Sequence, residues 1–282
     1  MKIAVLTDSA ANLSHEFINK NENLFVVPLM IVINGKEFRD GVEIEAKEVY
    51  EKLDTHKITT SLPSALDVEE KIKTIKKLGY TDLLVINISS GLSGTFNAIR
   101  LALQEEKDLN VLQYDTLTLA GGEGVIVKYA LELIAKKTPM KDILPKLDQM
   151  RHQDSLAFYT INTLKYLKAG GRIGKVEGTI GDLLHIKPVI TVNDEGEYVT
   201  LSKAFGLKRS LLKMKSILQE KFGDKLIDLI VHYGDNEEEA KELADKLRNS
   251  LNIRNVEVIR LTPVLGVHTG PEIYAYIANL VE

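Results

Sequence analysis

Short runs rich in Val, Ile and Leu alternate along this chain with longer amphipathic stretches, and this alternation constrains the fold most strongly. Strands that alternate with helical crossovers form parallel sheets covered by helices. In the first half of the chain we expect strands at 2–7, 24–33, 83–88, 110–115 and 156–161. We expect helices at 43–53, 64–79, 96–105, 123–137 and 141–150. The first half therefore predicts a three-layer α/β/α domain with a mainly parallel sheet.

The second half of the chain has a different pattern. The runs 186–192 and 198–204 flank an Asn-Asp-Glu-Gly-Glu turn, which predicts a β-hairpin and hence antiparallel pairing. We expect two further strands at 226–233 and 256–261, and helices at 206–221 and 236–250. A chain of 282 residues is long for one average domain. We therefore predict two α/β domains, 1–160 and 161–282, the second with a mixed sheet, that meet at a cleft.

Charge and residue usage exclude several classes of function. The net charge is −4, and Lys and Arg are interleaved with Asp and Glu, which argues against a nucleic-acid partner. The chain has no Cys, and its six His form no i, i+4 pair with acidic neighbours, so we expect no metal site. No run approaches ~18 apolar residues, and the N-terminus lacks the apolar core of a signal peptide. We expect a cytoplasmic protein.

The segment 89–95, Ser-Ser-Gly-Leu-Ser-Gly-Thr, is the most informative candidate site. It follows an apolar strand and precedes a helix, so free backbone N–H groups and the positive helix end can face an anion. It also lies at the carboxyl end of a parallel strand, where ligands of open α/β sheets bind. The alternative is that Ser93 only caps the helix. The segment is not a Walker loop, because no Lys follows its second Gly.

Two other segments rich in hydroxyl groups have both structural and functional interpretations. Thr60 and Ser61 lie in the segment 59–64, which we expect to be a loop entering a helix, and they can donate to a ligand. Asp8 ends the first strand, where it serves either as a turn and cap residue or as an active-site carboxylate.

His268 and Arg172 lie in glycine-containing segments. His268 is expected in a loop before a final helix that Pro271 begins, and a loop His is either incidental or a ligand, acid or base. Arg172 lies in Gly-Gly-Arg-Ile-Gly, where a mobile backbone would let its guanidinium reach an anion. A helix C-cap explains Gly170 and Gly171 equally well.

Taken together, several motifs in order along nearly the whole chain resemble the DegV family. They are 7–13 (TDSAANL), 60–64 (TSLPS), 89–95 (SSGLSGT), 170–173 (GGRI), 187–192 (KPVITV) and 266–271 (GVHTGP). Members of that family are lipid-binding proteins that carry acyl chains for bacterial fatty acid kinase. The resemblance implies two α/β domains that enclose a fatty acid, whose carboxylate a partner kinase phosphorylates to an acyl phosphate.

The resemblance also implies roles for individual residues. The carboxylate would be bound by Thr60, Ser61, Ser93, Gly94, Thr95 and His268. Arg172 would lie near the mouth, where the phosphoryl group arrives. No cofactor and no activity without the kinase are implied, and transient contact with a membrane fits such a carrier. Which of Thr60 and Ser61 contacts the ligand is left open, and we expect a monomer.

Two of the departures from the family pattern matter. Leu62 stands where the family often has Gln, and Phe205 replaces an Arg associated with kinase docking. The second departure weakens the expectation of a kinase partner more than that of lipid binding.

The physical chemistry agrees with the resemblance. A buried carboxylate is costly unless several donors satisfy it, and hydroxyls leave it less neutralised than an Arg clamp would. Burial of a long acyl chain contributes roughly 10 kcal/mol before ordering costs, at about 0.8 kcal/mol per methylene. If the chain is such a carrier, we expect purified protein to hold acids of about C14–C18, although no sequence pattern fixes the chain length. The alternatives are a stand-alone hydrolase or transferase that uses Asp8, Ser93 and His268, and a regulatory module that senses a small acid. The chain has no GxSxG elbow.

Overall fold

The first of the sheets is parallel and has four strands in the order β2-β1-β6-β7. The computed structural model describes residues 2–180 and 185–281. The strands are β1 (Ile3–Asp8), β2 (Leu24–Val27), β6 (Asp82–Asn87) and β7 (Asn110–Asp115). Helices α3 (Ala65–Lys77) and α4 (Thr95–Ala102) pack on one face, and α5 (Gly121–Ala135) packs on the other. This is the α/β/α layering that the sequence predicts. Two more helices belong to this half, α1 (His15–Lys20) and α6 (Met140–Gln149).

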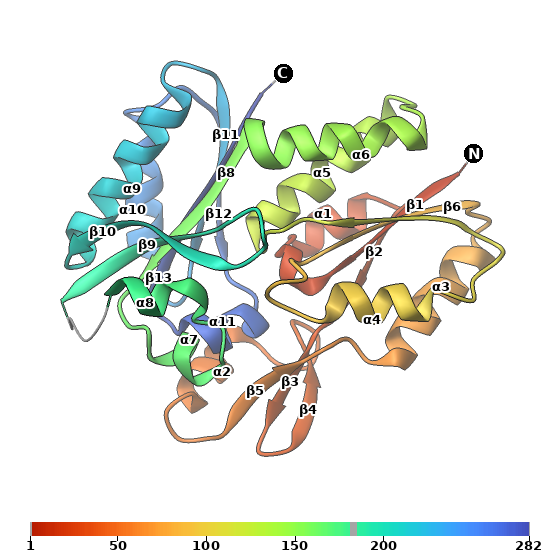
Figure 1. Cartoon of the computed structure of the whole chain (residues 1–282), viewed down its shortest axis with the longest axis horizontal. Helices are drawn as coiled ribbons and strands as arrows, with labels where there is room; N and C mark the ends of the chain where they lie inside the picture. Colours follow the sequence, from red (N-terminus) through yellow and green to blue (C-terminus); the bar gives the residue numbers. More distant parts are fainter. Residues whose placement is uncertain (1, 181–184, 282) are drawn as a thin grey trace.

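The second sheet is mixed and has six strands in the order β10-β9-β8-β13-β11-β12. The strands are β8 (Ser155–Ile161), β9 (Ile186–Val192), β10 (Tyr198–Phe205), β11 (Ile227–Tyr233), β12 (Ile253–Arg260) and β13 (Ile273–Leu280). Helices α9 (Leu207–Phe222) and α10 (Glu237–Arg248) cover its outer face, as Figure 1 shows at the left of the molecule. Helix α5 packs against the inner face, so one helix joins the cores of both sheets. The predicted α/β class with a parallel and a mixed sheet is confirmed.

A third, small antiparallel sheet lies beside the parallel and the mixed sheet. It is formed by β3 (Met30–Ile33), β4 (Lys36–Arg39) and β5 (Ile58–Ser61), with α2 (Ala46–Lys52) in the connection between β4 and β5. Helix α11 (Pro263–Thr269) packs against α2, β5 and α7 (Lys165–Ala169), which brings residues 263–269 onto this sheet. The remaining short helices are η1 (Ser9–Ala11), η2 (Met150–Asp154), η3 (Gly174–Val176) and α8 (Glu177–Ile180).

Two expected segments in the first hundred residues are different in the structure. The run 24–33 is two strands in two sheets, because it is interrupted at Pro28, which has no N–H to donate to a ladder. The segment around Thr60 and Ser61 is the edge strand β5 rather than a loop. Its residues pair with β3, Thr60 opposite Ile31 and Ser61 opposite Met30.

The segment around His268 and Pro271 also differs from the expectation. His268 lies inside helix α11, which Pro263 begins, and Pro271 follows this helix instead of starting another. The residues after Pro271 form β13, between β8 and β11 in the six-stranded sheet. Alternating apolar and aromatic side chains in Ile273–Leu280 suit a central strand, since both faces of this sheet are covered.

Strand β8 belongs to the six-stranded sheet, where it pairs with β13 and β9. The predicted first domain, 1–160, would place most of this strand with the parallel sheet. The chain thus reaches the second sheet at Ser155, before the predicted boundary. The division into domains 1–160 and 161–282 itself stays a prediction.

Candidate ligand-binding site

A cavity of about 250 Å³ lies where the three sheets meet. The inner face of the six-stranded sheet contributes Ala157, Tyr159, Ala275 and Ile277. The segments after β1 and β6 contribute Ala10 and Ile88, at the carboxyl ends of parallel strands. The other apolar residues that line it include Leu29, Leu62, Leu92, Leu119, Ala120, Phe158, Val192, Leu261, Val264, Leu265 and Ile273. Its walls are therefore mainly aliphatic, as an alkyl chain requires.

Polar side chains from separate segments of the chain meet in this cavity. Thr60 Oγ1 and His268 Nε2 lie 2.8 Å apart, although 208 positions separate them in sequence. Strand β5 presents Thr60, and α11 presents His268 from its last turn. The contact between α11 and β5 is thus what assembles the pair.

His268 is neutral at neutral pH in this environment. Burial, and then the positive charge of Arg172, lower the pKa of the imidazole to about 4. Its Nδ1 is buried and has no hydrogen-bond partner among the described residues. The tautomer determines whether the imidazole or the Thr60 hydroxyl donates in their bond. The free nitrogen, Nδ1, lies against Gly170, while Nε2 faces Thr60.

Ser93 is held by its own loop. Its hydroxyl lies 2.8 Å from Thr95 Oγ1, and the Thr95 backbone N–H donates to Ser93 Oγ at 3.3 Å. Upstream, Ser89 Oγ donates to Gly196 O at 2.8 Å, which ties the loop to the turn between β9 and β10. Gly94 rather than Ser93 is the cap residue of α4. Ser93 thus lines the cavity at a helix start, with its hydroxyl bonded to Thr95.

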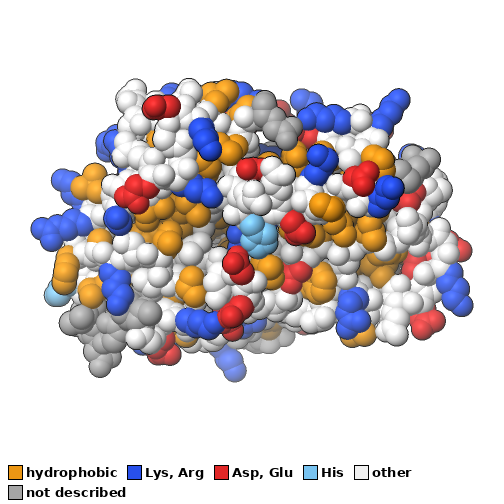
Figure 2. Space-filling view, turned by 45° about the horizontal axis from the view of Figure 1, so that its top comes forward, with side chains coloured by type: hydrophobic (Ala, Val, Ile, Leu, Met, Phe, Trp, Pro, Cys, Tyr) orange, Lys and Arg blue, Asp and Glu red, His pale blue; other side chains and the backbone are white. Residues whose placement is uncertain are grey.

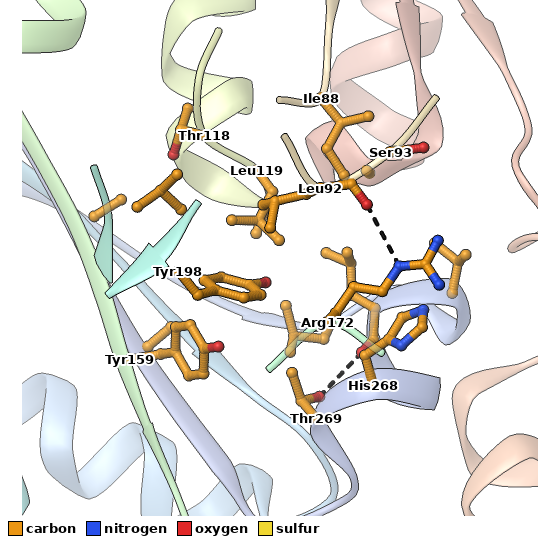
Figure 3. Close-up of a pocket in the computed structure, with 18 of the residues that line it drawn as sticks. Ile88, Leu92, Ser93, Thr118, Leu119, Tyr159, Arg172, Tyr198, His268 and Thr269 are labelled. Atoms are coloured by element: carbon orange, nitrogen blue, oxygen red, sulfur yellow. Dashed lines mark hydrogen bonds between the residues drawn. The ribbon is translucent and has the colours of Figure 1, made fainter. Parts of the chain in front are cut away.

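Arg172 lies at the mouth. It is exposed to solvent and also lines the cavity. Its Nη1 donates to Gly170 O at 2.7 Å and its Nε to Leu92 O at 3.5 Å. Figure 3 shows the guanidinium beside His268, on the same side of the cavity. A ligand carboxylate between Ser93 and His268 would therefore have a cation close by and solvent beyond it.

The structure brings most of the predicted site residues together. Thr60, Ser61, Ser93, His268 and Arg172 line the same cavity. Gly94 and Thr95 lie behind Ser93, and Thr95 is fully buried with its hydroxyl bound to Ser93. Thr95 is placed to orient Ser93, and its direct contact with a ligand stays a prediction, as does that of Gly94.

Asp8 is not placed to act with Ser93 and His268. It is fully buried, and its carboxylate accepts from the Asn87 amide and from the backbone N–H groups of Ile88 and Ala10. Burial raises the pKa of Asp8 to about 6. Within the part of the chain that the structure describes, no hydrogen bond joins Asp8 to His268 or His268 to Ser93. Asp8 instead organises the turn after β1 and the start of the 89–95 loop.

Sequence reasoning missed the polar residues at the far wall. Tyr159 on β8 and Tyr198 on β10 line the cavity, and their rings are 5.4 Å apart in an edge-on arrangement. The loop with Thr118, Leu119 and Ala120 also contributes, and Ala120 has a positive φ of 52°. The available signal was the alternation along β8, which puts Tyr159 on the same face as Ala157 and Ile161.

Residues 2–180 and 185–281 lack the features of two other classes of site. That part of the chain contains no group of three or more His, Asp or Glu side chains that could hold a metal ion. None of its helices is both long and apolar enough to cross a membrane. On the face drawn in Figure 2, Lys and Arg are interspersed with Asp and Glu instead of forming a continuous basic surface.

Comparison with known proteins gives consistent matches. A family model described as "Uncharacterised protein, DegV family" matches residues 2–279. A DegV domain-containing protein of Clostridium acetobutylicum is 38% identical over 270 residues, covering 96% of each chain. A solved structure of a DegV family protein from Thermus thermophilus, described by its fatty acid binding, has a TM-score of 0.92 at 30% identity and covers 100% of both chains. A stearic acid-binding protein from Eubacterium ventriosum has a TM-score of 0.87 at 26% identity, covering 99% of this chain and 98% of its own.

Proposed function

Because this chain belongs to the DegV family, we propose that it binds a long-chain fatty acid in the cavity described above. The carboxylate lies at Thr60, Ser93 and His268, and the alkyl chain extends toward the inner face of the six-stranded sheet. The protein acts in the cytoplasm as a carrier without catalysis of its own.

The observation that carries this proposal is the combination of an aliphatic cavity with neutral donors at one end. The Thr60–His268 pair and Ser93 come from three separate segments and line the same space. Two solved relatives of the same fold are described as binding fatty acids. Hydrogen bonds to a charged group contribute about 1.5–3 kcal/mol each, so these donors offset the cost of removing a carboxylate from water.

The binding step is tested with purified protein and defined ligands. Denaturing extraction followed by mass spectrometry should release acids of about C14–C18, and delipidated protein should bind added octadecanoic acid in a calorimetric titration. The methyl ester of the same acid should bind more weakly, because it lacks the charge that the donors recognise. Protein that is empty on purification and takes up no added acid would refute the proposal.

The carrier step is the second part of the proposal. A carboxylate oxygen of the bound acid attacks the γ-phosphorus of ATP on a partner kinase, the bond from that phosphorus to ADP breaks, and an acyl phosphate forms. The exposure of Arg172, which also lines the cavity, supports this step, since a cation there would attract an incoming phosphoryl group. Phe205, where the family has Arg, is 63% exposed on β10 and would face a partner directly.

This step is tested by adding a bacterial fatty acid kinase and ATP to the loaded protein and trapping the acyl phosphate with hydroxylamine. We expect product with the wild type and at least about tenfold less with Arg172→Ala, because a charged hydrogen bond to phosphate is lost. Phe205→Arg should increase the yield. Normal fatty acid binding with no product in either protein would reject the carrier step and leave the binding step in place.

A further inference from the structure

The inner face of the six-stranded sheet has a hollow at Ala157. This residue lies on β8, inside the sheet, and its ladder partner on β13 is the much larger Ile277. At the next inward position of β8 the sizes are reversed, because Tyr159 lies opposite Ala275. Both alanines line the cavity. A small side chain among large ones leaves space that its neighbours do not fill, and Ala157 is accordingly only partly buried, whereas Tyr159 is buried.

This hollow is distant from the residues proposed to bind the carboxylate. Helix α11, which presents His268, follows β12, and at that junction Leu261 N donates to Tyr233 O. Tyr233 lies opposite Tyr274 on β13. Tyr274 precedes Ile277 by three residues, so the two lie about 10 Å apart along the strand. The hollow and α11 are therefore at different ends of the inner face.

The first turn of α5 closes the cavity beside the hollow. A Cβ on Gly122 would lie 3.1 Å from Ala157 Cβ and 2.5 Å from Thr118 Oγ1, so the helix contacts the sheet here without room for a side chain. Figure 3 shows Thr118 across the cavity from Arg172 and His268. The start of α5 thus forms the end wall, on the side away from the head-group residues.

The position of this wall limits the length of a bound alkyl chain. Affinity increases about fourfold for each methylene that the chain buries, the equivalent of about 0.8 kcal/mol. The increase ends where the chain meets packed atoms, because a further methylene must displace them or remain outside. We propose that Ala157 receives the methyl end of the acyl chain and sets the longest chain that the cavity accepts. This inference rests on the proposed binding of a fatty acid and adds the residue that determines its length.

The experiment offers delipidated protein an equimolar excess of dodecanoic, tetradecanoic, hexadecanoic, octadecanoic and icosanoic acids, and quantifies the bound acids by mass spectrometry. In Ala157→Val two methyl groups occupy the hollow, so the ratio of bound tetradecanoic to octadecanoic acid should rise by at least about fourfold. Ile277→Val removes one carbon from the facing side chain and should shift the bound mixture toward longer acids. The readout is a ratio within one sample, so a general loss of stability does not imitate it.

The matched control is Ala204→Val on the edge strand β10 of the same sheet, since Ala204 does not line the cavity. We expect this variant to bind the wild-type mixture. A wild-type mixture in either folded variant, Ala157→Val or Ile277→Val, would overturn the assignment, even if every acid bound more weakly. Ile277→Val alone decides where Ala157→Val does not fold. Failure of every acid to bind the wild type would instead reject the proposed function.

Discussion

At the scale of single residues, the proposal depends on a few neutral donors. The hydrogen bond between Thr60 and His268, 2.8 Å long, fixes the two side chains relative to each other. Such preorganisation reduces the entropy lost on binding. Ser93 adds a third group from a loop whose hydrogen bonds fix its direction.

Removing these donors should weaken binding without unfolding the protein. We expect Thr60→Val and Ser93→Ala each to raise the Kd for octadecanoic acid by about tenfold or more, because each loses a hydrogen bond to a carboxylate. Ser90→Ala is the matched control, since Ser90 is an exposed residue of the same loop that does not line the cavity. Equal affinities in all three variants would exclude these donors from the head-group site.

The pKa of His268 offers a direct test of its contact with the ligand. It is lowered to about 4 in the structure, and a carboxylate beside the ring would stabilise the protonated form. We expect fatty acid binding to raise this pKa, measured by NMR titration of labelled histidines. His232 is the internal control, because burial also lowers its pKa to about 4 but it does not line the cavity. A shift at His232 and none at His268 would contradict the assignment.

Asp40 makes stability depend on pH. It is buried, its Oδ1 accepts from Val264 N at the start of α11, and burial raises its pKa to about 7 from 3.8. The folded protein thus holds this proton more tightly than the unfolded chain does. The resulting stabilisation is complete below about pH 4 and is lost as the pH rises toward 7.

Asp40→Asn should remove that dependence while keeping the acceptor for Val264 N. Between pH 5 and 7, the free energy of unfolding of the wild type should fall by about 2 kcal/mol relative to the variant. Urea denaturation at each pH measures this, with Glu51→Gln on the exposed face of α2 as control. A difference between wild type and Asp40→Asn that stays constant from pH 5 to 7 would show that Asp40 does not titrate as described.

At the scale of elements, patterns of apolar residues predicted most strands and helices, and the exceptions have physical causes. The sequence could not reveal that Pro28 divides one apolar run between two sheets, because that depends on which strands are available as partners. It also could not show that His268 belongs to α11, a helix of seven residues held by packing on α2 and β5. The hydroxyl and His residues of the site were predictable, because their motifs are local. Tyr159 was not, because only the cavity distinguishes it from a core tyrosine.

The contact between α7 and α11 gives a prediction at this scale. A Cβ at Gly170 would lie 2.2 Å from His268 Nδ1, so Gly170→Ala should displace the imidazole from Thr60. We expect about tenfold weaker fatty acid binding, from the loss of a hydrogen bond to the charged head group. Gly178→Ala is the control, since its Cβ meets nothing within 4 Å. Unchanged binding in Gly170→Ala would mean that the ring position is not critical.

At the scale of the whole molecule, the cavity exists because two large sheets share helix α5 and the small sheet closes one side. Alternation of strands and helices was enough to predict the two kinds of sheet. The size of the space between them depends on how Ala10, Ala120, Ala157 and Ala275 pack, which no local pattern encodes. The sequence therefore predicted the residues of a carboxylate site, and the structure shows the cavity that most of them line.

A crystal structure of the protein with octadecanoic acid tests the central claim most directly. We predict continuous density for the alkyl chain inside the cavity, with a carboxylate oxygen within hydrogen-bonding distance of Ser93 Oγ and of the Thr60–His268 pair. A carboxylate bound at the Tyr159 wall, or a chain lying outside the cavity, would contradict the account.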